Sequence, residues 1–313
     1  MIVLSMITKN SLKKVGVRNF ERVWLASLQV PYESIILVDD SSNNDTVDFV
    51  RKFSNDFGKE LIVSKSRLQY NGKTTRATAR QTAIDIFFEN FNDEWLFFLD
   101  DDFIIRNGWW NEASNYLNEM KVGLIWGVDY CPLWVKRQRW IEARGVDELT
   151  CAIKTFTIRG GLHDTLLRRE AIAGLKLPLW LNVYEDAWTK KYIECKGFEW
   201  RIVKTGGDHL RASGEGYTQD DLRQALEISI LLALEPTPFR RVLKTIFGLP
   251  AYIYYAKKAY GLKNSVKEGF SIWKRRVTYR YELWKKSNNI DPCEIINSQD
   301  AVEKFRISTF DKG

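Results

Sequence analysis

The stretch WLFFLDDDFI, residues 95–104, places three consecutive carboxylates directly after an apolar run. The apolar half of the stretch has the length and composition of a buried strand. A buried strand cannot leave three like charges without partners, because an unpaired charge in an apolar environment is strongly unfavourable. We therefore expect a cationic partner for Asp100, Asp101 and Asp102.

Upstream of this stretch, short apolar runs alternate with segments of helical spacing. The spacing predicts helices near residues 20–28, 47–53 and 75–88. The apolar runs predict strands at residues 2–8, 34–40, 60–66 and 95–99, and further along the chain at 121–130, 151–161 and 199–207. Alternation of this kind is typical of βα units, so we expect an α/β fold with an open, mostly parallel sheet flanked by helices.

Two of the predicted strands end in acid clusters. Asp39 and Asp40 follow the second strand, and the three aspartates of the opening stretch follow the fourth. Ligands of open α/β sheets bind outside the carboxyl ends of the strands, so this coincidence is the first functional signal. No GxGxxG follows the first strand and no GxxxxGK[ST] occurs, so the sequence supports neither a dinucleotide-binding fold nor a P-loop.

Asp100 and Asp102 form an acid-x-acid motif. On an extended segment their side chains share one face, and Asp101 faces the opposite way. Carboxylate oxygens are the usual ligands for the Mg²⁺ or Mn²⁺ that binds a diphosphate. Two alternatives stay open: acids after a strand are often only a solvated turn, and Asp101 with Asp102 could be the working pair.

Two further positions carry groups that suit this chemistry. Glu185 and Asp186 open a helix-like run, where an acid is equally well explained as a helix cap. His209 follows a predicted strand, where a lone histidine is more often a surface residue. A nitrogen ligand that completes an Asp/His set nevertheless suits Mn²⁺. The joint occurrence of these groups favours a metal-dependent site.

A resemblance to a known family rests on motifs in this order: SMITKN (5–10), ILVDDSSNNDT (36–46), TTRATARQTAI (74–84), FFLDDDF (97–103), YEDAW (184–188) and GDHLR (207–211). In this order they resemble the nucleotide-sugar glycosyltransferases of the GT-A fold, family-2 type. The likeness covers about residues 1–212. It implies a GT-A, Rossmann-like catalytic domain that carries a C-terminal helical extension.

The resemblance implies a donor-binding set. Thr8 and Asn10 would lie beside the base, and Asp39 or Asp40 would accept a hydrogen bond from a base N–H. Arg76 and Arg80 would face the base or the phosphates. Asp100 would face the ribose, and Asp101 belongs to the same donor-binding set.

The resemblance also implies the catalytic groups. Asp102, Asp100 and His209 would hold Mn²⁺ or Mg²⁺. Asp186, or in second place Glu185, would be the general base that takes the proton of the acceptor hydroxyl. The implied activity is transfer of a hexosyl group from a UDP- or GDP-sugar to a hydroxyl acceptor, with inversion at the anomeric carbon.

Two other classes of function compete with this one. A nucleotidyltransferase also uses acids and a divalent metal on an α/β sheet, but the glycine-rich phosphate loop expected near its N-terminus is missing. The second alternative is a non-catalytic protein that uses a GT-A scaffold to bind membrane or nucleic acid. We expect no nucleic-acid partner, because no recognised binding motif accompanies the basic residues.

The C-terminal third of the chain differs in composition. Residues 237–287 hold 13 Lys or Arg against 2 Glu, although the whole chain has a net charge of only +7. We expect a catalytic domain at 1–235, a basic, aromatic helical extension at 236–290 and a tail at 291–313. The extension either packs on the catalytic domain with a solvated basic face or binds an anionic membrane surface, which would suit a lipid-linked acceptor.

The sequence also bears on location. The N-terminus MIVLSMITKN has no basic residue before its apolar core and no small-residue cleavage site, which argues against a secretory signal. No apolar run approaches the roughly 18 residues that suggest a membrane span. We expect a cytoplasmic protein, with peripheral binding at the inner face of the membrane if the extension is an anchor.

Overall fold

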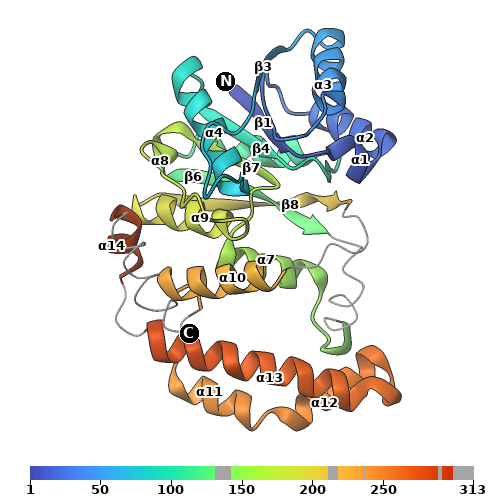
Figure 1. The fold of residues 1–313 in the computed structure, drawn as a ribbon, viewed down its shortest axis with the longest axis vertical. Coiled ribbons are helices and arrows are strands. Elements are labelled where there is room, and N and C mark those ends of the chain that lie inside the picture. The colour runs from blue at the N-terminus through green and yellow to red at the C-terminus, as the bar shows by residue number, and fades with distance from the viewer. Residues whose placement is uncertain (131–141, 211–217, 236, 288–290, 299–313) are drawn as a thin grey trace. The chain divides into compact units, whose positions relative to one another are not determined.

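The computed structural model covers residues 1–313 and describes all of them except 131–141, 211–217, 236, 288–290 and 299–313 (Figure 1). The chain forms two compact units. The first comprises Met1–Leu133 and Arg159–Thr218, and the second comprises Trp134–Ile158 and Gln219–Gly313. The predicted domain boundary at residue 236 stays a prediction.

The first unit is built on an eight-stranded sheet with the strand order β3-β2-β1-β4-β7-β6-β8-β5 (Figure 1). Its strands are β1 (Ile2–Thr8), β2 (Ser34–Asp39), β3 (Glu60–Ser64), β4 (Trp95–Leu99), β5 (Phe103–Ile105), β6 (Val122–Tyr130), β7 (Asp164–Arg168) and β8 (Glu199–His209). The pairs β1–β2, β1–β4, β2–β3 and β6–β8 are parallel. The other three pairs are antiparallel. The predicted mostly parallel α/β sheet is confirmed.

The parallel strands β1, β2 and β4 form the centre of the core. Every residue of β4 is buried, as are all but one residue of β1 and of β2. Parallel strands with both faces covered read as continuous apolar runs, which is why their positions could be predicted from the sequence. Their carboxyl ends therefore lie at one edge of the sheet, where the acids of the opening stretch emerge.

Helices flank this sheet within the first unit (Figure 1). They are α1 (Ser11–Val15), α2 (Val17–Ser27), α3 (Asp45–Asp56), α4 (Arg76–Asn90), α5 (Trp109–Ala113), the 3-10 helix η1 (Ser114–Tyr116), α8 (Arg169–Ile172) and α9 (Glu185–Cys195). Helix α4 begins with a capping box, in which the Thr75 side chain accepts from the Thr78 N–H and the Thr78 hydroxyl bonds the Thr75 N–H. This cap sets where α4 starts and so where Arg76 and Arg80 project.

One predicted strand is wrong. Residues 151–161 do not form a strand, because Glu148–Arg159 is the helix α7. Its buried residues Ala152 and Phe156 are four positions apart, which is helical spacing, and this burial outweighs the β-branched composition that suggested a strand. The strand of this region is β7, which the sequence did not reveal because it is only five residues long and begins with Asp164.

The second unit is helical over its described residues. Besides most of α7 it contains α10 (Gln219–Leu231), α11 (Phe239–Ile246), α12 (Leu249–Tyr260), α13 (Leu262–Ser287) and α14 (Pro292–Asn297). The basic segment breaks near Gly248 and Pro250, since α11 ends at Ile246 and α12 begins at Leu249. Within the described residues, none of the helices combines the length and the apolar character that crossing a bilayer requires.

Candidate active site

The site forms where β4 ends and the chain turns into β5. The three aspartates lie between these strands, and β5 pairs antiparallel with the last residues of β8, with Phe103 opposite His209. This register brings His209 to the aspartates although more than a hundred residues separate them. The Leu210 N–H donates to the Asp102 carbonyl at 2.6 Å, and His209 Nε2 lies 2.9 Å from Asp102 Oδ1.

The predicted metal ligands converge. One ligand atom each from Asp100, Asp102 and His209 lies within 4.8 Å of the other two. Two carboxylate oxygens and one imidazole nitrogen are a donor set that suits Mn²⁺ and accepts Mg²⁺. The residues therefore fit a divalent cation.

Asp101 is directed elsewhere. Among the described residues the cluster contains Asp100 and not Asp101, whose carboxylate accepts a hydrogen bond from the Ser11 hydroxyl. Burial, together with the neighbouring charge of Asp102, raises the pKa of Asp101 to about 7. The alternative in which Asp101 and Asp102 form the working pair therefore has less geometric support than the Asp100 and Asp102 pair.

His209 is buried between two carboxylates. Its Nδ1 lies 3.5 Å from Asp129 Oδ2, which leaves Nε2 directed at Asp102. Burial alone would lower the pKa of His209, but Asp102 and Asp129 outweigh it and raise the pKa to about 9. In the metal-free protein His209 is therefore protonated at neutral pH, and binding of a cation at Nε2 must displace that proton.

This raised pKa gives the metal-free protein a pH-dependent stability. The folded-state pKa of about 9 lies above the ordinary 6.5, so protonated His209 stabilises the fold fully below pH 6.5 and this contribution is lost as pH rises through 9. The loss amounts to about 3 kcal/mol at most. Urea unfolding with a chelator, at pH 6 to 9.5, should show the stability advantage of the wild type over His209→Gln shrinking as pH rises. Parallel pH curves for the two proteins would contradict the assignment.

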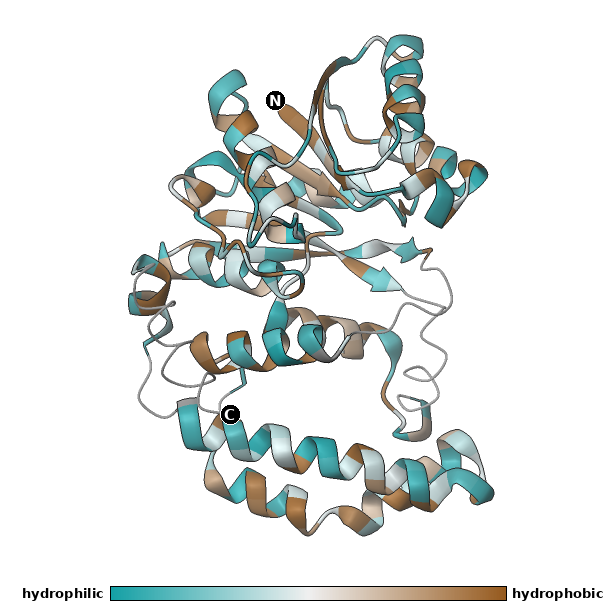
Figure 2. Cartoon of the chain, viewed as in Figure 1, coloured by the Kyte–Doolittle hydropathy of each residue, from teal (hydrophilic) through white to brown (hydrophobic). Residues whose placement is uncertain are grey.

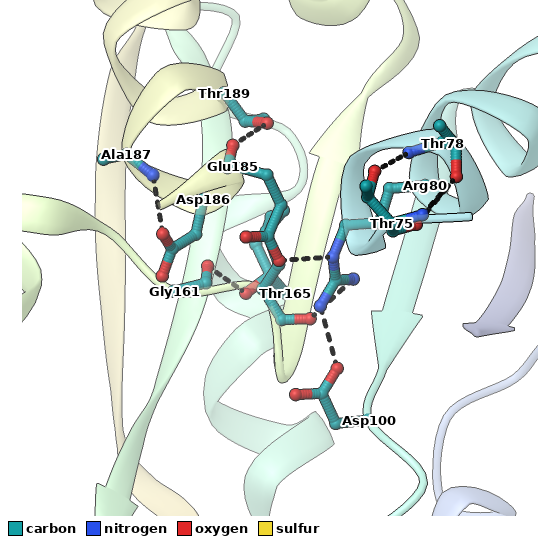
Figure 3. A network of polar contacts seen from close by, with 11 residues as sticks. Thr75, Thr78, Arg80, Asp100, Gly161, Thr165, Glu185, Asp186, Ala187 and Thr189 are labelled. Atoms are coloured by element: carbon teal, nitrogen blue, oxygen red, sulfur yellow. Dashed lines mark hydrogen bonds and ion pairs between the residues drawn. The ribbon is translucent and has the colours of Figure 1, made fainter. Parts of the chain in front are cut away.

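Arg80 is the protein's own cation at this site. Its side chain is only 4% exposed and lies between two carboxylates, with Nη2 2.9 Å from Asp100 Oδ1 and Nε 3.2 Å from Glu185 Oε1 (Figure 3). Burial would raise the pKa of Asp100, but Arg80, the two histidines and Arg76 outweigh it and lower the pKa. Arg80 and His209 together supply the cationic partners that the opening stretch requires.

Removing this guanidinium leaves the buried carboxylate of Glu185 and the half-buried carboxylate of Asp100 without their partner. We expect Arg80→Met to lower the free energy of unfolding by about 3–5 kcal/mol, measured by urea denaturation. The matched control is Arg67→Met, because Arg67 makes an exposed ion pair with Glu89 at 2.7 Å and should lose no more than about 1 kcal/mol. Equal losses in the two variants would show that Arg80 carries no special structural role.

The two candidate bases occupy different environments at the N-terminus of α9. Glu185 is buried and bound to Arg80, and burial followed by the charge of Asp186 raises the pKa of Glu185. Asp186 is half-buried, and its Oδ1 accepts from the Ala187 N–H at 2.8 Å (Figure 3). Asp186 is therefore the more accessible carboxylate. Gly160 lies against its backbone, where a Cβ would come within 2.9 Å of the Asp186 carbonyl.

The predicted donor-binding residues gather at the ends of β1 and β2. The Thr8 hydroxyl donates to Asp39 Oδ1 at 2.7 Å, and the Ser41 hydroxyl donates to the same oxygen at 2.5 Å. Asp40 accepts from the N–H and the hydroxyl of Ser66 at 3.0 and 2.7 Å. Asn10 adopts a left-handed conformation with φ 58°, and its N–H donates to Ser41. Arg76 is exposed at the start of α4 and acts electrostatically on Asp100, Asp101 and Glu185.

A buried polar network beside the site was not predicted from the sequence. His163 Nδ1 lies 2.7 Å from Asp164 Oδ1, and the His163 ring stacks on Phe103 with 4.5 Å between centroids. The Nε1–H groups of Trp126 and Trp109 donate to His163 Nε2 and Asp164 Oδ2. The signal that could have identified it is the dipeptide His163-Asp164, which follows the paired glycines 160 and 161 after one intervening residue. Asp129, inside β6, carried no comparable signal.

Comparisons with known proteins give one family match. Residues 21–171 match the family model described as Glycosyl transferase family 2. No curated protein matches the chain.

Solved structures share the fold. One is S. aureus TarS 1-349 in complex with UDP-GlcNAc, with a TM-score of 0.53, 14% identity and coverage of 98% of this chain and 91% of that one. Another is the mannosyltransferase PcManGT from Pyrobaculum calidifontis in complex with GDP-Man and Mn²⁺, with a TM-score of 0.52, 14% identity and coverage of 100% and 88%. At such identities the likeness concerns the fold.

Proposed function

Because the chain carries a glycosyl transferase family 2 segment on a GT-A fold, we propose that it transfers a hexosyl group from a UDP- or GDP-sugar to a hydroxyl acceptor, with inversion. The predicted family resemblance and the glycosyltransferase class are confirmed by the family match, and the solved structures confirm the predicted fold. The observation that carries the proposal is the convergence of Asp100, Asp102 and His209 within 4.8 Å. The complexes of TarS with UDP-GlcNAc and of PcManGT with GDP-Man and Mn²⁺ support the choice of donor class.

In this proposal the donor lies across the carboxyl ends of β1, β2 and β4. Thr8, Asn10, Asp39 and Asp40 bind the base, and the exposed Arg76 meets the phosphates. Asp100, Asp102 and His209 hold Mn²⁺ or Mg²⁺, which when bound neutralises charge on the departing diphosphate.

The acceptor side is assigned to Asp186. Its carboxylate takes the proton of the acceptor hydroxyl while that oxygen bonds to the anomeric carbon and the bond from that carbon to the diphosphate oxygen breaks. Attack from the face opposite the leaving group inverts the configuration. Glu185 forms an ion pair with Arg80, so in this proposal Glu185 has a structural role and Asp186 is the general base.

A panel of UDP- and GDP-sugars tests this function directly. We expect one donor to be hydrolysed slowly in the presence of Mn²⁺ and not in the presence of a chelator, and the same donor with Mn²⁺ to raise the melting temperature. A non-catalytic scaffold would show neither effect. Cleavage between the α- and β-phosphates instead of at the sugar would identify a nucleotidyltransferase.

The proposal extends to the place of reaction. The basic segment 237–287 would hold the enzyme peripherally at the inner, anionic face of a membrane that carries a lipid-linked acceptor. Transfer to a polyprenyl-linked sugar in anionic vesicles should then be faster than transfer to the same sugar free in solution. Equal rates on the two acceptors would remove the lipid-linked acceptor from the proposal.

A further inference from the structure

The short helix α11 exposes apolar side chains on one side and contacts helix α13 on the other. Val242 is fully buried, and the backbone carbonyls of Thr245 and Ile246 accept from the Trp273 Nε1–H of α13 at 2.9 and 3.1 Å. The opposite side presents large apolar residues to solvent, and Phe247 after the helix is 78% exposed. These exposed apolar residues of α11 and its end are Leu243, Ile246, Phe247 and Phe239, the last of which also packs its ring on Trp284 of α13 with 4.8 Å between centroids.

Helix α12 continues the same arrangement. Gly269 of α13 lies against Ile253 of α12, where a Cβ would come within 2.8 Å of the Ile253 Cα, so the inner side of α12 faces α13. Tyr254 is 54% exposed, and Lys258 lies over its ring at 4.9 Å. Figure 2 shows brown, hydrophobic residues along both helices interrupted by teal, hydrophilic ones. The outer sides of α11 and α12 therefore combine apolar and cationic groups.

The charge on these outer sides is of one sign. Residues 239–260 contain five Lys or Arg and no Asp or Glu. Arg241 is paired with Glu235 at 3.6 Å. The other four have no carboxylate within ion-pair distance in the described part of the chain, and they are Arg240, Lys244, Lys257 and Lys258.

A solvated face and a membrane-binding face differ in what they expose. Exposure of a phenylalanine together with leucine and isoleucine to water is unfavourable, and exposed apolar clusters of this kind mark interaction sites. A protein partner would need acidic residues to match four unpaired cations. An anionic bilayer offers both a negative surface and an apolar interior a few ångströms below it, which is the environment that basic amphipathic helices bind.

We propose that these four apolar residues, Tyr254 and the four unpaired cations form one interfacial face that binds the surface of an anionic lipid bilayer. Phe247 and Leu243 enter the boundary between head groups and acyl chains, and Lys244 and Lys257 meet the lipid phosphates and carboxylates. The inference names the residues that would bind the membrane in the proposed function, and its biological role rests on that function. The binding itself does not depend on sugar transfer.

Flotation of the full chain with vesicles tests the interfacial face. We expect the wild type to float with vesicles that contain phosphatidylserine, to float less with pure phosphatidylcholine, and to be released by high salt. Lys244→Gln should lower partitioning by about fivefold, and Phe247→Ser should lower it at least as much. The matched control is Met120→Ser in the first unit. Met120 is 73% exposed and lies outside the proposed face, so its replacement should leave partitioning to the vesicles unchanged.

Two outcomes would overturn the inference. One is no flotation of the wild type at low salt, and the other is equal flotation of the wild type and Phe247→Ser. Light scattering without lipid tests whether a second copy of the chain binds the interfacial face instead of a membrane. A dimeric wild type and a monomeric Phe247→Ser would identify the face as an interface between copies of the chain. Unchanged melting temperature and unchanged donor hydrolysis in solution show that Phe247→Ser is folded. If neither the wild type nor the variants hydrolyse a nucleotide-sugar donor but the wild type still floats with anionic vesicles, the proposed function is refuted. The inference that the interfacial face binds lipid would be unaffected.

Discussion

Asp102→Asn is expected to abolish metal-dependent sugar transfer and leave the protein folded. Asparagine keeps the shape of the side chain but removes the charge that pairs with His209 at 2.9 Å and that would hold the cation. Neutralisation of a leaving group by a metal contributes several kcal/mol, so kcat/KM should fall by about a thousandfold or more. The measurement is transfer as a function of Mn²⁺ concentration, with a melting curve on the same sample.

The matched control for this variant is Asp208→Asn. Asp208 is the residue before His209 on β8, but its exposed carboxylate pairs with Arg106 at 2.7 Å and takes no part in the cluster. Its replacement should leave transfer unchanged. Retained turnover in Asp102→Asn, or an equal loss in Asp208→Asn, would remove the metal role from Asp102.

Asp186→Asn is expected to lower kcat of transfer by about 10²–10⁴ and to leave cation and donor binding intact. The reason is that Asp186 is the accessible acid at the start of α9, and its replacement changes none of the three residues that would hold the cation. Steady-state transfer combined with calorimetric donor binding separates the two effects. A fall in donor affinity with unchanged kcat would assign Asp186 to binding.

Glu185→Gln distinguishes the second candidate base. Because Glu185 is buried against Arg80, its replacement should act first on stability, and donor hydrolysis should respond less than in Asp186→Asn. If Glu185→Gln stops transfer in a fully folded protein and Asp186→Asn does not, the roles of the two acids are exchanged.

The sequence predicted those parts of the fold that depend on local signals. Strands β1, β2 and β4 are buried on both faces, so their apolar runs stand out, and the helices between them carry apolar residues at helical spacing. Helix α7 was predicted as a strand, and strand β7 was not predicted. In both cases the burial of a key residue, Phe156 or Asp164, depends on distant packing partners and not on the composition of its own segment. Tertiary contacts overrode propensity in both.

The candidate site divides in the same way. Asp100, Asp102 and His209 could be predicted because their residue types and their places after strands suggest a metal site, and the structure brings them together. The bridge from Arg80 to Asp100 and Glu185 joins residues 20 and 105 positions apart, which no local pattern encodes. The contact of Asp129 with His209 depends on the pairing of β6 with β8 and was missed for the same reason.

The most direct test of the account is a crystal structure of the chain with Mn²⁺ and a nucleoside diphosphate, examined by anomalous scattering. The account predicts one manganese peak coordinated by Asp100, Asp102 and His209 Nε2 and contacting the diphosphate. A bound nucleotide with no manganese at that position, or with manganese held by other residues, would contradict it.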